Sequence, residues 1–286
     1  MKENIVYDFT SINGILESLS KYLKIEQKSI INYISNLRIG FDLIQFLEDH
    51  RIEDEQLLEC DLSLVSLHVT TNNDECASIK KYGLINLQKA ISLETPVSNF
   101  LRSQGISINI EQQQIHYNGK IYSISEDSMN EDIKLIYYKL YNDYQVNSFL
   151  SYSNVLEYGV ESVPEFIENL ADLLESNDIC DNWIKFNNQC YVIKFVAPLS
   201  NYADHNFYEQ GCNRLSKEDF QFLSEELELL KRIWILNQSF NIIINYYTWN
   251  QIKDLFGILK FDVEVPNTDI KKIYTPDEYL NEYQID

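Results

Sequence analysis

Apolar positions in the first sixty residues follow the period of an α-helix. In "SINGILESLSKYLKI" they recur at intervals of three and four and so share one helix face: Ile12, Ile15, Leu16, Leu19 and Leu23. The segment "EQKSIINYISNLRIGFDLIQFLEDHRI" continues the pattern, and Gly40 predicts a break within it. A helical region is therefore predicted over residues 1–62.

The pattern then changes to that of strands mixed with helices. The run "SLVSLHVTT" predicts a strand. Thr95 and Pro96 have the residue types preferred at a helix start, and Gly105 predicts that helix's end. The stretch "ISINIEQQQIHYNGKIYSI" predicts two strands joined by a hairpin turn at Asn118 and Gly119.

The second half of the chain continues this mixture. The segment 126–151 reads mostly as helix, and two further helices are predicted with Ser162 and Ser216 as N-caps. Strands are predicted in "QCYVIKFVAPL", "NIIINYYTW" and "GILKFDVEVP". Because strands and helices do not alternate regularly, the pattern predicts an α+β fold, with a second domain over residues 63–286.

Composition narrows the function classes. The chain has 286 residues and 45% hydrophobic residues, which is typical of a globular protein. Lys and Arg number 23 against 44 Asp and Glu, a net charge of −21, which disfavours affinity for nucleic-acid phosphates. The scattered odd number of cysteines, the start without an apolar signal core and the lack of long apolar runs predict a cytoplasmic protein that does not enter a membrane.

A local unit around His68 carries the most specific chemistry. His68 and Thr70 lie two apart in the predicted strand and so share a face. Asn72 or Asn73 is expected to cap the following helix, with Asp74 and Glu75 in its first turn, and Gly83 is expected to end it. On the residues alone, His68 could equally be a half-buried strand histidine bonded to a neighbouring backbone group.

The stretch "LHVTTNNDECASIKKYGL", residues 67–84, resembles the first motif of the ADP-ribosyltransferase-like superfamily, an H-x-T strand followed by a helix ending in Gly-Leu. The resemblance implies a mixed or antiparallel β core with helices, and NAD as substrate without a metal. It implies that His68 binds a ribose hydroxyl of NAD and that Thr70 helps to shape the nicotinamide-ribose site. His50, His116 and His205 lie far apart without metal-binding spacing.

The resemblance also implies an aromatic residue that stacks on nicotinamide and a late catalytic carboxylate. Tyr158 in "NVLEYGVESVPEFIENL" is the first candidate for the aromatic, and Tyr152 is the second. Asp262 in "DVEVP" takes the place where the family usually has Glu, and Glu264 would share its strand face. Arg102 could meet an NAD phosphate. The alternative for Asp262 and Glu264 is a purely structural role, in which they form a charged face of an edge strand.

These features predict an NAD-dependent ADP-ribosyltransferase that modifies a macromolecular acceptor, a protein rather than a nucleic acid, as a bacterial toxin or phage-defence effector would. The N-terminal helices would offer a surface for a protein partner. The alternative is an inactive module of the same fold that senses NAD or ADP-ribose, or binds a protein. An RNA 2′-phosphotransferase shares the first motif but requires several Arg near the phosphate, which this acidic chain does not favour.

Overall fold

The computed structural model describes residues 2–37, 40–158, 163–186, 189–207 and 224–285. Two compact units make up the chain. Unit 1 comprises Met1–Leu67, Asn147–Ser153 and Phe195–Ile258, and unit 2 comprises His68–Val146, Asn154–Lys194 and Leu259–Asp286. Helices and antiparallel strands occur in both, which confirms the predicted α+β class. The expected N-caps Ser162 and Ser216 lie outside the described residues.

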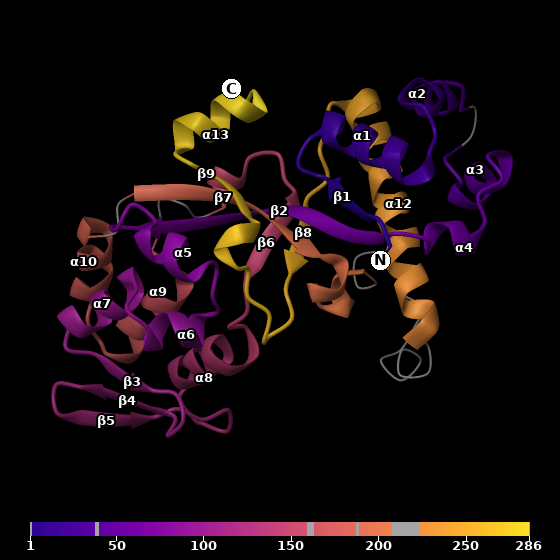
Figure 1. The fold of residues 1–286 in the computed structure, drawn as a ribbon. Coiled ribbons are helices and arrows are strands. Elements are labelled where there is room, and N and C mark those ends of the chain that lie inside the picture. The colour runs from indigo at the N-terminus through magenta and orange to yellow at the C-terminus, as the bar shows by residue number, and fades with distance from the viewer. Residues whose placement is uncertain (1, 38–39, 159–162, 187–188, 208–223, 286) are drawn as a thin grey trace. The chain divides into compact units, whose positions relative to one another are not determined.

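Unit 1 begins with a strand that the sequence pattern did not predict. β1 (Asn4–Asp8) runs parallel to β2 (Asp61–Asn72), with Ile5 opposite Leu62. The predicted N-terminal helices follow as α1 (Ile12–Leu23), α2 (Gln27–Ser35), α3 (Leu43–Asp49) and α4 (Asp54–Leu57). Gly40 lies between α2 and α3, as expected. Figure 1 shows α1 beside the long helix α12 (Ser224–Trp249), with which it packs.

The prediction of a strand in "NIIINYYTW" is wrong, because this segment forms the last third of α12. Phe240, Ile242 and Ile243 are fully buried on it. Phe240 stacks on Phe41 with ring centroids 4.4 Å apart and also contacts Phe46. The free energy gained by burying these side chains in the helical conformation outweighs the β propensity of three consecutive Ile.

A buried cation anchors the middle of α12. The Arg232 guanidinium donates to the carbonyl oxygens of Leu57 at 2.8 Å and Cys60 at 2.9 Å, and it pairs with Glu228 at 2.9 Å. These acceptors satisfy a charge that would otherwise be costly to bury. Arg232 therefore ties α12 to the end of α4 and to the start of β2.

The main sheet has the hydrogen-bonded order β8 (Leu255–Ile258), β6 (Asn147–Ser151), β2, β7 (Gln189–Pro198) and β9 (Ile270–Tyr274), with β1 beside β2. β6 is antiparallel to its neighbours, with Phe149 opposite Leu67 and Phe256. This strand ends a segment that we expected to be mostly helix. Only α8 (Glu131–Tyr137) and the π-helical turn Tyr138–Asn142 precede it as helix.

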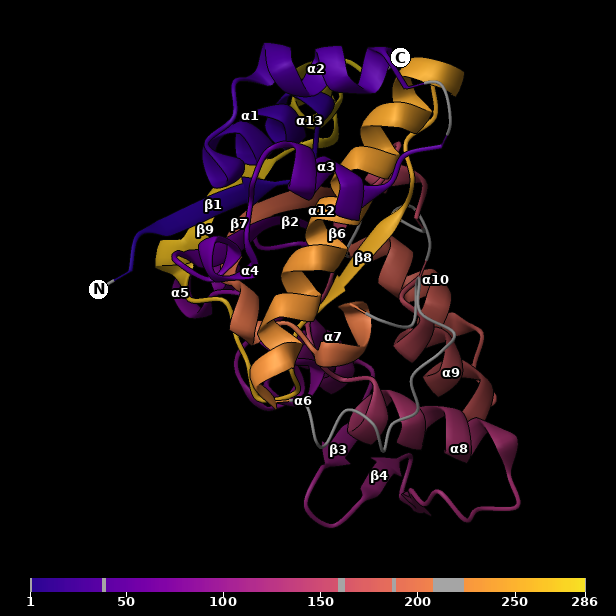
Figure 2. The same cartoon turned by 90° about the vertical axis from the view of Figure 1, so that its right-hand side faces the viewer.

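Unit 2 contains a second, three-stranded sheet and most of the shorter helices. β3 (Ser107–Asn109), β4 (Gln114–Tyr117) and β5 (Lys120–Ser123) form the sheet. The helices are α5 (Ala77–Tyr82), α6 (Leu87–Ser92), α7 (Pro96–Ser103), α9 (Glu165–Leu173), α10 (Asp178–Phe186) and α13 (Pro276–Tyr283). In Figure 2, α8, α9 and α10 follow one another as packed neighbours.

Two local predictions for unit 2 are confirmed. The Thr95 hydroxyl accepts from the Ser98 amide at 3.3 Å and caps α7, whose first residue is Pro96. Asn118 and Gly119 both have positive φ, 49° and 77°, as a two-residue hairpin of this hand requires. Phe100 on α7 packs edge-on against Trp183 on α10 at 5.0 Å, which places both residues in the core of this unit.

No helix in the described part of the chain is both long and apolar enough to cross a bilayer.

Candidate functional site

His68 and Thr70 lie on the part of β2 that belongs to unit 2. Leu67 before them is buried, whereas His68 and Thr70 are half-exposed, so the strand passes from core to partial solvent access at this point. Successive strand residues face opposite sides, so the imidazole and the hydroxyl share one face. This half-exposed face is where a ligand could meet both groups.

The turn after β2 is held by Asn72 rather than by a helix cap. The buried Asn72 accepts from the Cys76 amide at 3.3 Å and donates to the Cys76 sulfur at 3.2 Å. Glu75 and Cys76 have φ of 53° and 59°, so α5 begins only at Ala77. The expectation that Asp74 and Glu75 form the first helical turn is therefore wrong, because the side chain of Asn72 stabilises a tight turn there instead.

Burial keeps the Cys76 thiol in its neutral form. Its residue is fully buried, and burial raises the pKa of the thiol above its usual range. A neutral buried thiol is a poor nucleophile and a poor metal ligand. Cys76 is therefore a hydrogen-bonding partner of Asn72 in the turn that follows His68 and Thr70.

The helix–Gly-Leu end of the motif contacts a segment far along the chain. Gly83 has φ +80°, and a Cβ built on it would lie 2.0 Å from the Val265 carbonyl oxygen. The Leu84 amide donates to the Val265 carbonyl, and the Val265 amide donates to the Leu84 carbonyl, both at 2.9 Å. Only glycine permits this approach. The Gly-Leu element therefore lies directly against the acidic segment "DVEVP".

The acidic segment is not the strand that we predicted. β8 ends at Ile258, Phe261 and Asp262 form a turn, and Val265 joins Leu84 in an isolated bridge. The Val263 amide donates to the Lys260 carbonyl at 3.0 Å, which closes the turn. Asp262 and Glu264 therefore do not share a strand face, because chain reversal after β8 interrupts the pleat.

The two carboxylates have different surroundings. Asp262 is exposed in the turn. Glu264 is half-buried, with 29% of its side chain exposed, and it pairs with the Lys89 ammonium at 2.6 Å. A carboxylate held by an ammonium has less negative charge to offer to a substrate than a solvated one.

An aromatic pair lies beside this turn, and sequence reasoning missed it. The rings of Tyr144 and Phe261 stack with centroids 5.1 Å apart and planes 25° apart. The Tyr144 carbonyl accepts from the Leu87 amide at 2.8 Å. Burial, and then the charge of Asp262, raise the pKa of the Tyr144 phenol. Nothing local distinguishes Tyr144 among 20 tyrosines except its place just after the π-helical turn.

The remaining predicted residues are placed differently. Tyr158 follows a short 3₁₀ turn, Val155–Glu157, and 59% of it is exposed. Tyr152 belongs to unit 1, where its ring contacts Phe149 at 5.0 Å. Arg102 is exposed on α7 and donates to Asn99 one turn earlier. The contacts that join residues 84–89 with residues 261–265 involve none of these three side chains.

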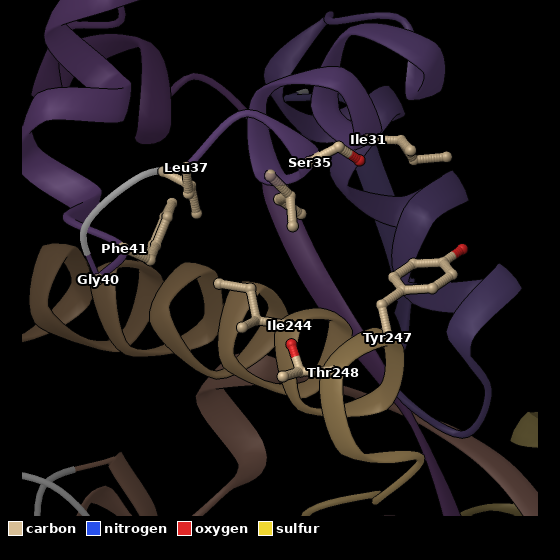
Figure 3. A pocket seen from close by; sticks show the side chains of 9 residues that line it. Ile31, Ser35, Leu37, Gly40, Phe41, Ile244, Tyr247 and Thr248 are labelled. Atoms are coloured by element: carbon tan, nitrogen blue, oxygen red, sulfur yellow. The ribbon is translucent and has the colours of Figure 1, made fainter.

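Unit 1 contains an apolar cavity of about 500 Å³ (Figure 3). It is lined by residues of α2, of the chain just after α2, and of α12: Ile31, Ile34, Ser35, Leu37, Gly40, Phe41, Ile244, Tyr247 and Thr248. None of these nine residues is charged, so the lining does not suit a dinucleotide with two phosphates. None of the predicted site residues lines this cavity.

Among the described residues, no three His, Cys, Asp or Glu side chains gather in a way that could hold a metal ion.

Comparison of the chain with protein-family models, with curated proteins and with solved structures finds no match.

Proposed function

We propose that this protein is an NAD-dependent ADP-ribosyltransferase that transfers ADP-ribose to a macromolecular acceptor. The observation that supports the proposal is the bridge between Leu84 and Val265. It joins the end of the H-x-T motif to the acidic segment, although the two are separated by nearly two thirds of the chain. The resemblance predicts these two elements in one site, and the bridge supports that prediction.

The reaction breaks the bond between nicotinamide and the ribose C1′ and forms a bond from C1′ to an acceptor nucleophile, which loses its proton. Positive charge develops on the ribose in the transition state, as in glycoside cleavage. Asp262, the exposed carboxylate, would stabilise this charge. His68 would hold a ribose hydroxyl, and Thr70 on the same face would help to orient the nicotinamide ribose.

We assign the stacking aromatic to Tyr144 rather than to Tyr158. Tyr144 is half-buried and already paired with Phe261 beside Asp262, whereas Tyr158 is mostly exposed. A pre-ordered ring loses less freedom when it stacks on a substrate.

Replacing Tyr144 with Ala is expected to raise the KM for NAD about tenfold, since one aromatic stacking contact on a base is worth about 1–3 kcal/mol. Tyr144→Phe keeps the ring and should retain most of the affinity. Steady-state kinetics of both variants and of Tyr158→Ala test the assignment. A larger loss in Tyr158→Ala than in Tyr144→Ala would return the role to Tyr158.

A second candidate function is a non-catalytic module that binds NAD or ADP-ribose. The observation that favours it is the ion pair between Lys89 and Glu264, which leaves only the shorter Asp262 unpaired where the family usually has Glu. A shorter carboxylate reaches less far toward the ribose. The net charge of −21 favours a protein over a nucleic acid as acceptor or partner under either proposal.

Incubation of the full chain with NAD labelled in the adenylate, with and without bacterial extract, tests the two functions. A transferase is expected to release nicotinamide and to label a protein band. Binding of NAD or ADP-ribose measured by calorimetry, without nicotinamide release, would support the binding module instead. If the chain neither binds NAD or ADP-ribose nor releases nicotinamide, both proposals are contradicted.

A further inference from the structure

Asn86, the N-cap of α6, and Lys89 within α6 both contact the acidic segment. Asn86 caps α6, and its side chain accepts from the Lys89 amide at 2.9 Å and donates to the Phe261 carbonyl at 3.4 Å. Lys89 reaches Glu264 at 2.6 Å. Residues 86 and 89 thus contact both ends of the turn that carries Asp262.

The consequence differs for the two carboxylates. The charge of Glu264 is compensated, and its side chain is held toward α6. The carboxylate of Asp262 forms neither a hydrogen bond nor an ion pair with any residue that the structure describes. Asp262 is exposed in the turn that also carries Phe261, whose ring stacks on that of Tyr144.

We propose that Lys89 is a positioning residue that removes Glu264 from the reaction and leaves Asp262 as the reacting carboxylate. This assignment rests on the proposed transferase function. A group that stabilises a developing cation must offer uncompensated negative charge, and the Lys89 ammonium at 2.6 Å compensates part of that of Glu264.

Single replacements separate the two carboxylates. Asp262→Asn is expected to lower kcat for nicotinamide release by about a hundredfold or more, with little change in KM for NAD. Glu264→Gln is expected to lower kcat by less than about fivefold. Thermal unfolding followed by circular dichroism checks that both variants are folded.

Lys89→Met tests the positioning role in combination with Asp262→Asn. With Lys89 in place, Asp262→Asn leaves Glu264 in its ion pair, and turnover stays low. Adding Lys89→Met releases the Glu264 carboxylate, so kcat should rise by about tenfold over that of Asp262→Asn alone. Adding Lys89→Arg instead keeps the ion pair and should give no such rise, which a merely structural role would not predict.

Two results would overturn the assignment alone. One is an equal loss of kcat in Glu264→Gln and Asp262→Asn, and the other is no recovery of kcat when Lys89→Met is added to folded Asp262→Asn. Absence of turnover in the wild-type chain would overturn the proposed function and this assignment with it. The two failures are therefore distinguished by the wild-type measurement.

Discussion

His68→Ala is expected to lower the rate of nicotinamide release from NAD by about a hundredfold or more, to the limit of detection. In the proposed mechanism the imidazole holds a ribose hydroxyl, and loss of such alignment costs about this much even when the chemistry-bearing groups remain. His68 is half-exposed within β2, four residues before the end of the strand, so its removal should leave the fold largely intact. The release of labelled nicotinamide measures the effect.

His116→Ala is the matched control. His116 is an exposed residue of β4 in the second sheet, and its replacement should leave the rate within about twofold because exposed substitutions are mostly neutral. If the protein acts as a toxin, expression of the wild type should arrest growth of a bacterial host, and expression of His68→Ala should not. Full activity in folded His68→Ala would contradict the proposed role of the motif.

Gly83→Ala is expected to lower the free energy of unfolding by about 3–5 kcal/mol. The backbone of Gly83 is in a region that is almost restricted to glycine, with φ 80° and ψ −163°, and occupation by another residue costs about 1–3 kcal/mol. The new Cβ would also lie 2.0 Å from the Val265 carbonyl oxygen, so the two bridge hydrogen bonds would have to move apart at about 1 kcal/mol each. Urea denaturation measures the change.

Gly105→Ala separates the effect of contact from that of backbone conformation. Gly105 also has positive φ, 71°, but an added Cβ would meet no described atom within 4 Å. We expect a loss of about 1 kcal/mol, from the left-handed conformation alone. Equal losses in the two variants would mean that the contact with Val265 contributes nothing. A folded Gly83→Ala should also turn over NAD more slowly, because the acidic segment moves.

Local patterns predicted most of the elements that begin or end at a residue with a strong preference for a helix cap or a turn. The cap at Thr95 and the hairpin turn at Asn118–Gly119 were predicted from residue type, because one capping side chain or the positive φ of the turn residues decides the backbone there. The turn after β2 was mispredicted for the opposite reason. Asn72 there bonds to Cys76 and forms a tight turn, and residue type does not tell which of two local hydrogen-bonding patterns is formed.

Which side chains pair with one another in the site could not be predicted from the sequence. The pattern proposed Asp262 at the catalytic position with Glu264 on the same strand face, yet the two are not on one strand and Lys89 pairs with Glu264. It proposed Tyr158 because of its neighbours along the chain, whereas Tyr144 stacks on Phe261 beside the acidic turn. Both distinctions depend on side chains that are distant in sequence.

The sequence by itself determined the α+β class, the helices between residues 12 and 57, and the strand that carries His68 and Thr70. These depend on the spacing of apolar residues and on local backbone preference, which act over a few positions. Only the tertiary structure decided that residues 241–249 are helix, that the chain reverses after β8, and that Gly83 contacts Val265. Burial of apolar side chains and pairing of backbone groups between distant segments outweigh local propensity at those places.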